Sequence, residues 1–443
     1  MELVEKIKFY SENSHYAFHT PNHIGRSGFN ADLTELPGLD NIEYPEDSIK
    51  KAQAEIAEYF NAEASFFLTN GASLGLQAAL QALKIDLLRE SRDLKPVLLA
   101  RNIHKSVLSA IIQTGFDIEF LELFYDDDLD LYTGLDFSKL NSSENYSALV
   151  ITNPSYEGFY SEIPKQEIPV IVDEAHGAHY YFSEYLPAGA LNSGADIVIQ
   201  SWHKCLTALT QGAVAHVNKK SKISKDSFHD ALRLLQSTSP SYLILKSLCE
   251  AFLLFKKNGE ELLANLKHIT SKIPELIKAT SNHDFTRLIL KLPNGINVED
   301  FDAELEKSNI YCESYSNKSI LFFLSVFHEK KDIDYLIEEY FKIEKKLAIA
   351  ADKHMGEELK NINLSTAKQI LNPQKAFFSP FELVNLAEAE GYISADYFAL
   401  CPPGFPITIP GQIITRDIIE KLQLSKEFMN LQDGKIKVLL RRV

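Results

Sequence analysis

Between about residues 64 and 217, short and strongly apolar runs alternate with longer segments of helical spacing. The apolar runs cover residues 64–69, 96–100, 148–152, 169–173 and 197–199. Short runs that are rich in β-branched residues are typical of buried parallel strands. Strands that alternate with helices predict one large α/β domain built around a mostly parallel sheet.

Two of these runs deliver an ionisable residue at their carboxyl ends. The run 169–173 ends in Asp173, and the run 197–199 leads at once to Gln200-Ser-Trp-His-Lys204. A lysine that directly follows a core strand is hard to explain as a surface residue, and lysine is seldom fully buried without a partner. In open α/β sheets, ligands bind in the crevice beyond the carboxyl ends of the strands, where both side chains should lie. A lysine that forms a Schiff base and an aspartate that holds a pyridinium nitrogen are the pair that pyridoxal 5'-phosphate requires.

A third apolar run leads into a candidate anion site, Asn70-Gly-Ala-Ser-Leu-Gly75, which a helical segment follows. A strand, a glycine turn and a helix start gather free backbone N–H groups at the positive end of a helix dipole, so the cofactor phosphate should bind there with Ser73 as an extra donor. The segment also matches Gly-x-Ser-x-Gly, the nucleophile turn of serine hydrolases, for which the aspartate above and His176 or His203 are nominal partners. We favour the cofactor, because the hydrolase interpretation leaves Lys204 without a role.

Further polar side chains follow other strands of the same sheet. His104 comes after the run 96–100 at the start of a helix, so its imidazole could face the crevice and stack on an aromatic ring. A helix cap or a surface residue is the alternative for this histidine. Asn153 and Tyr156 follow the run 148–152 and are also expected near the ligand.

Metal binding is a weaker alternative at the same edge. His176 and His179 stand beside Asp173 and Glu174 and could imitate a metal cluster. However, histidines at positions i and i+3 directly after a strand lack the helical frame that zinc sites use, so we predict no metal.

Charge and cysteine usage exclude some classes of function. The net charge of −16 argues against nucleic acid as the main partner, and it is compatible with a cationic substrate or simply with solubility. The four cysteines, Cys205, Cys249, Cys312 and Cys401, show no paired spacing, which favours a reducing compartment. The N-terminus lacks the apolar core of a signal peptide, and no apolar run reaches the roughly 18 residues of a membrane helix. We therefore expect a cytoplasmic protein.

The 443 residues divide into four predicted units. We predict an N-terminal arm at 1–45, a large cofactor-binding domain at 46–265, a small α/β domain at 266–350 and a C-terminal domain at 351–443. In the small domain, strands are expected at 286–292 and 319–325 and helices at 298–308 and 331–347. In the C-terminal domain, residues 380–390 are expected to be helical.

Taken in order along the chain, these motifs resemble the Orn/Lys/Arg decarboxylases of the aspartate-aminotransferase fold, in particular their short bacterial members. The motifs that carry the resemblance are residues 19–25, 32–40, 70–73, 101–106, 151–158, 173–179, 200–204, 237–242 and 402–404. The resemblance implies decarboxylation of lysine, arginine or ornithine with pyridoxal phosphate, in polyamine-type metabolism. It also implies a PLP-dependent transferase-like (fold type I) large domain with a mostly parallel seven-stranded sheet, a smaller α/β domain and a C-terminal domain.

The same resemblance implies a role for individual residues. Lys204 would be the Schiff-base lysine, Asp173 the partner of the pyridine nitrogen, and His104 the imidazole stacked on the cofactor ring. Other cofactor-binding residues, which include the phosphate ligands, would be Ala72, Ser73, Ser201, His203, Ala175 and His176. Two subunits of this fold usually complete each other's sites, so a homodimer is expected. The residues that could then contact the substrate or the neighbouring subunit are His19, His23, Ser239 and Ser241.

The chain departs from the family pattern at Asn22, Ile24, Cys401 and Gln412, where Gly, Lys, Tyr and Glu are usual. These positions bear on substrate choice and on activity, not on the lysine or the aspartate. Two alternatives stay open: another reaction on the same cofactor, such as transamination or a different lyase reaction, or a regulatory protein that binds the cofactor without turnover. Only the family resemblance selects decarboxylation, because Lys204 and Asp173 do not determine which bond breaks.

Overall fold

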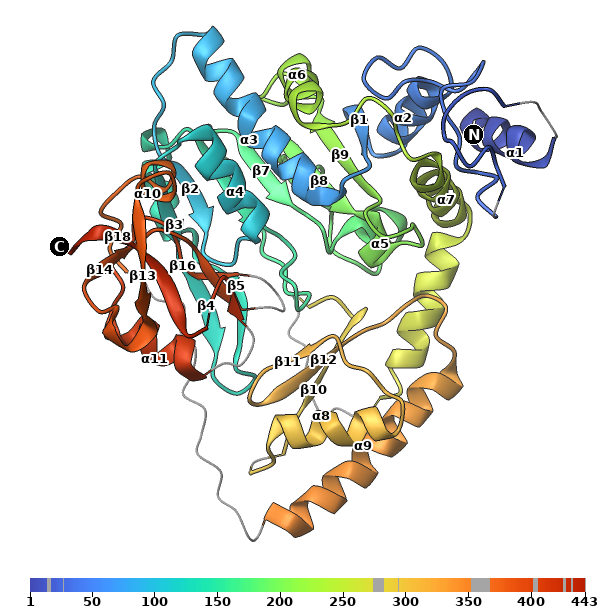
Figure 1. The fold of residues 1–443 in the computed structure, drawn as a ribbon. Helices are drawn as coiled ribbons and strands as arrows, with labels where there is room; N and C mark the ends of the chain where they lie inside the picture. Colours follow the sequence, from blue (N-terminus) through green and yellow to red (C-terminus); the bar gives the residue numbers. More distant parts are fainter. Residues whose placement is uncertain are drawn as a thin grey trace.

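The structure, a computed structural model, describes residues 1–13, 17–26, 28–273, 283–293, 295–351, 367–400, 405–424, 428–431 and 433–442. Its largest sheet has seven strands in the order β1-β9-β8-β7-β6-β2-β3 (Figure 1). The strands are β1 (Ala62–Leu68), β2 (Val97–Ala100), β3 (Ile118–Leu121), β6 (Ala148–Thr152), β7 (Val170–Asp173), β8 (Ile197–Ser201) and β9 (Ala213–Asn218). β9 runs antiparallel to both of its neighbours, and all other pairings in the sheet are parallel, which confirms the predicted architecture.

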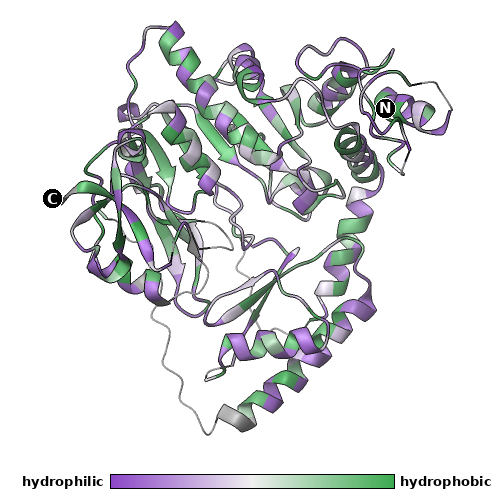
Figure 2. Ribbon diagram, viewed as in Figure 1, coloured by the Kyte–Doolittle hydropathy of each residue, from purple (hydrophilic) through white to green (hydrophobic). Residues whose placement is uncertain are grey.

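Helices cover both faces of this sheet. One face packs on α3 (Gly71–Arg89), α4 (Lys105–Thr114) and α6 (Lys225–Leu235), and the other on α1 (Glu2–Glu12), α2 (Ser48–Tyr59) and α7 (Tyr242–Thr270). Within β8, Ile197 and Ile199 face the first layer and Val198 faces the second. Because neither face meets water, the strands are apolar at successive positions instead of alternating. Figure 2 shows apolar residues along the central strands and polar residues on the helices around them.

Shorter elements connect the strands of the large sheet. They are the hairpin β4 (Leu123–Asp126) and β5 (Leu131–Leu135), the 3-10 helices η1 (Phe137–Asn145) and η2 (Ala178–Phe182), and the one-turn helix α5 (Trp202–Cys205). The N-terminal arm after α1 has no helix or strand among its described residues up to α2. The buried Asp40 carboxylate fixes its end, because it accepts hydrogen bonds from the N–H groups of Asp47 and Ile49 at 2.8 and 2.7 Å.

A smaller antiparallel sheet follows α7. Its strands, in the order β10-β12-β11, are β10 (Arg287–Lys291), β12 (Ser319–Phe323) and β11 (Ser314–Tyr315). Helices α8 (Val298–Lys307) and α9 (Lys330–Ala351) bury Phe301, Leu305 and Tyr340 against it. β10, β12, α8 and α9 occur where the sequence predicts them, whereas the short strand β11 was not predicted.

The C-terminal part contains two more three-stranded sheets, β13-β18-β14 and β16-β15-β17. The elements are α10 (Pro373–Phe377), β13 (Phe381–Asn385), η3 (Leu386–Glu388), β14 (Tyr392–Ser394), β15 (Phe398–Leu400), β16 (Pro406–Thr408), α11 (Arg416–Leu424), β17 (Phe428–Met429) and β18 (Lys435–Arg442).

The predicted helix at 380–390 is wrong, because residues 381–385 form an edge strand that pairs antiparallel with β18. Leu, Ala and Glu favour a helix locally, but the backbone hydrogen bonds to a strand some 50 residues later override that preference. The boundaries of the four units stay predictions. Of the described helices, none has the length and apolar character needed to cross a membrane.

Candidate active site

The one-turn helix α5 sets the direction of Lys204. Trp202 points into the core, where it is fully buried and its Nε1 donates a hydrogen bond to Gln200 Oε1 at 2.8 Å. Phe60 and Phe252 stack on its indole ring. Lys204, two residues later, points out of the core, and its Nζ lies 3.1 Å from Nε2 of His176.

The expectation that Lys204 is not a surface residue is wrong for the single chain, because the residue is exposed. The physical reason is the turn itself: Trp202 takes the inward direction at the end of β8, which leaves the outward direction for Lys204.

Asp173 ends β7, the strand next to β8. The two strands are parallel, with Asp173 opposite Ile199, so the carboxylate and the amine lie at the same edge of the sheet. Asp173 is buried and its Oδ1 accepts a hydrogen bond from the N–H of Ala175 at 3.1 Å. Burial raises the pKa of Asp173, although the charge of Lys204 and the Ala175 N–H oppose that shift. A cation beside this carboxylate would lower its pKa again.

Two neutral imidazoles face the same amine. His176 is buried and its Nδ1 finds no hydrogen-bond partner in the described part of the chain. Burial and then the charge of Lys204 hold the pKa of His176 well below its usual range. Burial and then Lys204 also lower the pKa of His104 to about 4. His104 is at the same time the N-cap of α4, where its Nδ1 accepts a hydrogen bond from the N–H of Ser106 at 3.2 Å, so the cap alternative and the crevice prediction both describe this side chain.

The candidate anion site is the start of α3. Gly71 adopts a left-handed φ of 73°, which glycine tolerates without strain, and no side chain caps the helix. The N–H of Gly71 donates to the carbonyl of Gln211 at 3.0 Å, and His203 Nδ1 lies 3.1 Å from the carbonyl O of Gly212. The loop after α5 therefore joins the start of α3 to the segment of Ser201, His203 and Lys204. Ala72 is buried and Ser73 half-buried at this start.

These residues fit pyridoxal phosphate by the chemistry of their donors. An amine can hold the aldehyde, a buried carboxylate with one hydrogen bond can meet a ring nitrogen, and an uncapped helix start can meet a phosphate. Nδ1 of the buried His176 has no hydrogen-bond partner in the described residues, so it is a polar atom at this place that a ligand could satisfy.

The small sheet contributes side chains that sequence reasoning missed. Phe323 at the end of β12 lies 5.6 Å from the ring of His176, and Tyr156 lies 5.0 Å from the same ring. The Tyr156 hydroxyl donates a hydrogen bond to the carboxylate of Glu313, and the Arg287 guanidinium stacks 4.0 Å above Phe323. Only Tyr156 was predicted near the ligand. No local pattern marks Glu313, Arg287 or Phe323, since tertiary packing alone brings them to the lysine.

Several predicted residues have no contact with this cluster in the described part of the structure. His23 Nε2 pairs with Asp32 Oδ2 at 3.1 Å, and His19 Nδ1 lies 2.6 Å from the carbonyl O of Thr20. Ser239 is exposed, and Ser241 is the N-cap residue of α7. The expected roles of His19, His23, Ser239 and Ser241 in a shared site stay predictions.

Asn153 also differs from the expectation that it faces the ligand. Its amide bonds twice to the backbone of Ser161, at 2.9 and 3.0 Å, and so closes the loop after β6. Asn22 and Ile24 are exposed in the arm, and Gln412 is buried in the C-terminal part, where its Oε1 accepts a hydrogen bond from the N–H of Ile409. Cys401 and the motif 402–404 lie outside the described residues.

The other two chemistries weighed from the sequence find no support in the geometry. The described residues contain no group of three His, Cys, Asp or Glu side chains that could hold a metal ion. Within the same residues, Ser73 has no hydrogen bond to a histidine. His176 lies beside Lys204 Nζ and His203 beside the carbonyl O of Gly212, each at 3.1 Å.

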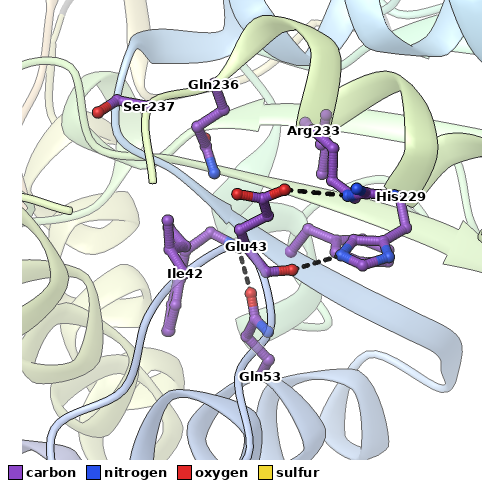
Figure 3. Close-up of a pocket in the computed structure, with 10 residues that line it drawn as sticks. Ile42, Glu43, Gln53, His229, Arg233, Gln236 and Ser237 are labelled. Carbon is purple, nitrogen blue, oxygen red and sulfur yellow. Dashed lines mark hydrogen bonds and ion pairs between the residues drawn. The ribbon is translucent and has the colours of Figure 1, made fainter. Parts of the chain in front are cut away.

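A pocket elsewhere in the molecule is too small for a ligand (Figure 3). It lies where the end of the N-terminal arm meets β1 and α6, and its volume is about 10 Å³, roughly the space of one water molecule. Glu43 closes it, because its carboxylate pairs with Arg233 at 3.0 Å and its carbonyl bonds His229 at 2.7 Å. The pocket shares no residue with the cluster around Lys204. The contacts of Glu43 hold the end of the arm against the large domain.

Comparisons with known proteins show what the chain is similar to. The family model described as "Orn/Lys/Arg decarboxylase, major domain" matches residues 4–293. The chain is 28% identical to the arginine decarboxylase of Bacillus subtilis, a match that covers 98% of this chain and 94% of that protein. It is 27% identical to the lysine decarboxylase LdcA of Pseudomonas aeruginosa, over 54% of this chain and 38% of that protein. The crystal structure of the Francisella novicida lysine decarboxylase LdcF superposes with a TM-score of 0.81 at 19% identity, covering 98% of this chain and 80% of that one.

Proposed function

Because the chain belongs to the Orn/Lys/Arg decarboxylase family, we propose that it removes CO2 from arginine to give agmatine, with pyridoxal phosphate as its cofactor. The family is one of basic amino-acid decarboxylases, so the proposal concerns the choice among the basic amino acids and the roles of the residues. The observation that carries it is the placement of Lys204 and Asp173 at one edge of the sheet, together with Glu313, which accepts a hydrogen bond from the Tyr156 hydroxyl next to His176.

Two observations favour arginine among the basic amino acids. In sequence, the matched relatives that carry the name arginine decarboxylase align over nearly the whole chain, whereas the matched lysine decarboxylases align over little more than half of it. The ring of Tyr156, which lies beside His176 and Phe323, also suits a guanidinium group, because a planar cation can stack on it while it meets the carboxylate of Glu313. The compact ammonium group of lysine can also lie over a ring, but it lacks the planar fork that stacks on a ring and pairs with a carboxylate at the same time.

The residues of the large domain bind and orient the cofactor in this proposal. When bound, pyridoxal phosphate supplies an electron sink for the charge left at Cα once CO2 departs. Lys204 Nζ would bind the aldehyde, and the carboxylate of Asp173 would favour a proton on the ring nitrogen. The start of α3, with Ser73, Ser201 and His203, would bind the phosphate, and the neutral ring of His104 would stack on the pyridine.

Proton transfer falls to the same amine and its neighbour. Nζ of Lys204 lies within hydrogen-bond distance of Nε2 of His176, whose low pKa keeps the imidazole an acceptor at neutral pH. Once the substrate amine has taken its place, Nζ of Lys204 is free to carry a proton to Cα. His176 then holds Nζ in position through the transfer.

We further propose that two copies of the chain complete the site. Lys204 is exposed in the single chain, whereas chemistry of this kind requires that water be excluded. Ser239 and the arm around His19 and His23 are the candidates to cover it from a second copy.

The test is a substrate panel. The purified protein with pyridoxal phosphate receives arginine, lysine or ornithine, and CO2 and the product amine are measured together. Agmatine formation at a kcat/KM at least about tenfold above that for lysine is expected, which corresponds to a difference of roughly 1.4 kcal/mol in transition-state binding. Equal or higher rates with lysine would contradict the arginine assignment. Cofactor binding without any CO2 release would favour the regulatory alternative.

A further inference from the structure

A second ionisable cluster lies directly behind Lys204, at the contact between the large domain and the small sheet. It joins His179 of η2, Cys205 at the end of α5, and Asp284 and Arg287 at the start of β10. His179, Asp284 and Arg287 are each at most 2% exposed. None of these four residues has a role in the proposed reaction.

The first pair in the cluster is an ion pair. His179 Nε2 lies 2.8 Å from Asp284 Oδ2, and the N–H of Thr286 donates to Asp284 Oδ1 at 2.8 Å. Burial opposes a charged imidazole, but Asp284 and, after it, Cys205 outweigh that effect and together raise the pKa of His179 to about 9. Burial alone would raise the pKa of Asp284, but the charge of His179 holds that pKa well below its usual range. The pair therefore carries one positive and one negative charge at neutral pH.

Arg287 adds a second buried positive charge. Its NH1 donates to Thr286 Oγ1 at 3.0 Å, its NH2 donates to Cys205 Sγ at 3.3 Å, and its Nε finds no partner in the described part of the chain. Glu174, another buried acid near His179, is engaged by Gln200, Tyr181 and the N–H of Ala190, and burial raises its pKa to about 7.

With the Cys205 thiol neutral, these four residues would hold two cations, His179 and Arg287, against the single carboxylate of Asp284. The neighbouring Glu174 is only partly ionised at neutral pH, because burial raises its pKa to about 7. An uncompensated charge is costly to bury, and an anion at Sγ removes the imbalance. We propose that Cys205 is held as a thiolate paired with Arg287, and that it is a reactive modification site for small electrophiles beside Lys204.

A neutral thiol is the competing state, and it would use a different contact. Sγ of Cys205 also lies 3.7 Å from the carbonyl O of Ala175, to which a thiol could donate. The contact with Arg287 is 0.4 Å shorter (3.7 against 3.3 Å) and comes from a charged donor. Burial alone would raise the pKa of Cys205, but Arg287 and His179 outweigh it and the net shift is downward.

The other described cysteines should behave in the opposite way. Burial raises the pKa of Cys249 to about 12. Burial and a hydrogen bond to Asp302 raise the pKa of Cys312. At mildly acidic pH, a thiol-directed reagent should therefore distinguish Cys205 from Cys249 and Cys312.

The modification is a simple substitution. With iodoacetamide, the Sγ thiolate attacks the methylene carbon, an S–C bond forms, the C–I bond breaks and iodide leaves with the electron pair. The thiolate has no proton to release. The thioether product is neutral, so the reaction removes the negative partner of Arg287.

The test follows the labelling rate of Cys205 in the protein loaded with pyridoxal phosphate, between pH 6 and pH 9, by mass spectrometry of the Cys205 peptide. An ordinary thiol with a pKa of about 8.5 loses roughly 200-fold of its rate between pH 9 and pH 6. Cys205 is expected to lose clearly less than that, because Arg287 and His179 lower its pKa. This measurement needs no catalytic activity. If arginine proves not to be the substrate, the labelling result still tests the thiolate proposal.

Variants of Arg287 test the pairing itself. Arg287→Gln should return the labelling profile of Cys205 to that of an ordinary thiol, whereas Arg287→Lys, which keeps the charge, should preserve the shallower pH dependence of the wild type. If the Arg287→Gln variant fails to fold, the labelling profiles of the wild type and of Arg287→Lys still test whether Cys205 is a thiolate. An ordinary profile for wild-type Cys205, or no labelling of it under conditions that label a free cysteine peptide, would overturn the proposal.

Discussion

The sharpest prediction concerns the carboxylate of Glu313. Replacing it by Gln keeps the shape of the side chain and its hydrogen bond with the Tyr156 hydroxyl, but removes the negative charge opposite a cationic substrate. Hydrogen bonds to charged groups contribute about 1.5–3 kcal/mol when they are shielded from water. Glu313 is exposed in the single chain, so solvent screening lowers that figure to about 1–2 kcal/mol. The expected loss in kcat/KM for arginine is therefore about 5- to 30-fold.

The assay compares arginine with citrulline, whose side chain has nearly the same shape and no charge. Glu313→Gln should lower kcat/KM for arginine and leave kcat/KM for citrulline within about twofold of the wild-type value. The preference of the enzyme for arginine over citrulline should therefore decrease. Glu306→Gln, on an exposed part of α8, is the matched control and should change neither. An equal loss with both substrates would refute charge recognition by Glu313, and an unchanged rate with arginine would place its guanidinium elsewhere.

Three further outcomes are expected. Lys204→Ala should abolish turnover and the visible absorption of bound pyridoxal phosphate; retained activity would overturn its assignment. Asp173→Asn should still bind the cofactor yet lose about 100-fold or more in kcat, since the ring nitrogen no longer faces an anion, and near-normal rates would make the aspartate purely structural. For His179, the pKa in the folded protein, about 9, exceeds the unfolded value of about 6.5. Its contribution to the free energy of unfolding is therefore complete below pH 6.5 and is lost as the pH rises through 9. Denaturant titrations should therefore show the stability gap between wild type and His179→Gln shrinking by on the order of 3 kcal/mol over that range, and a constant gap would contradict the ion pair with Asp284.

The large domain could be predicted from the sequence because each of its strands is covered on both faces. A strand such as 197–199 then appears as an uninterrupted apolar run, and the parallel order brings the carboxyl ends of neighbouring strands together. That geometry was enough to place Asp173 beside Lys204. The orientation of Lys204 was not predictable in the same way, because it depends on which residue of α5 the core accepts, and Trp202 fills that space.

The errors share a physical cause. Residues 381–385 have the composition of a helix and become a strand only because β18 offers a partner. Glu313 and Phe323 join the site because β11 and β12 pack against the loop after β6, more than 150 residues away in the chain. Local patterns carry no information about such partners. The residues that we propose to contact the substrate side chain were therefore not predicted, whereas those that we propose to hold the cofactor were.

This division follows the architecture. The amine and the acid are fixed by adjacent strands of one rigid sheet, whereas Glu313 reaches the amine through Tyr156 and His176 from a different sheet. A change in the small sheet can therefore alter the charge and length of the accepted side chain without moving the reacting groups. Gln412, one of the departures from the family pattern, is buried in the C-terminal part with all its described hydrogen bonds there, so its effect on substrate choice would have to pass through packing. Substrate preference should accordingly respond to substitutions on β11 and β12 more strongly than to restoring Glu at position 412.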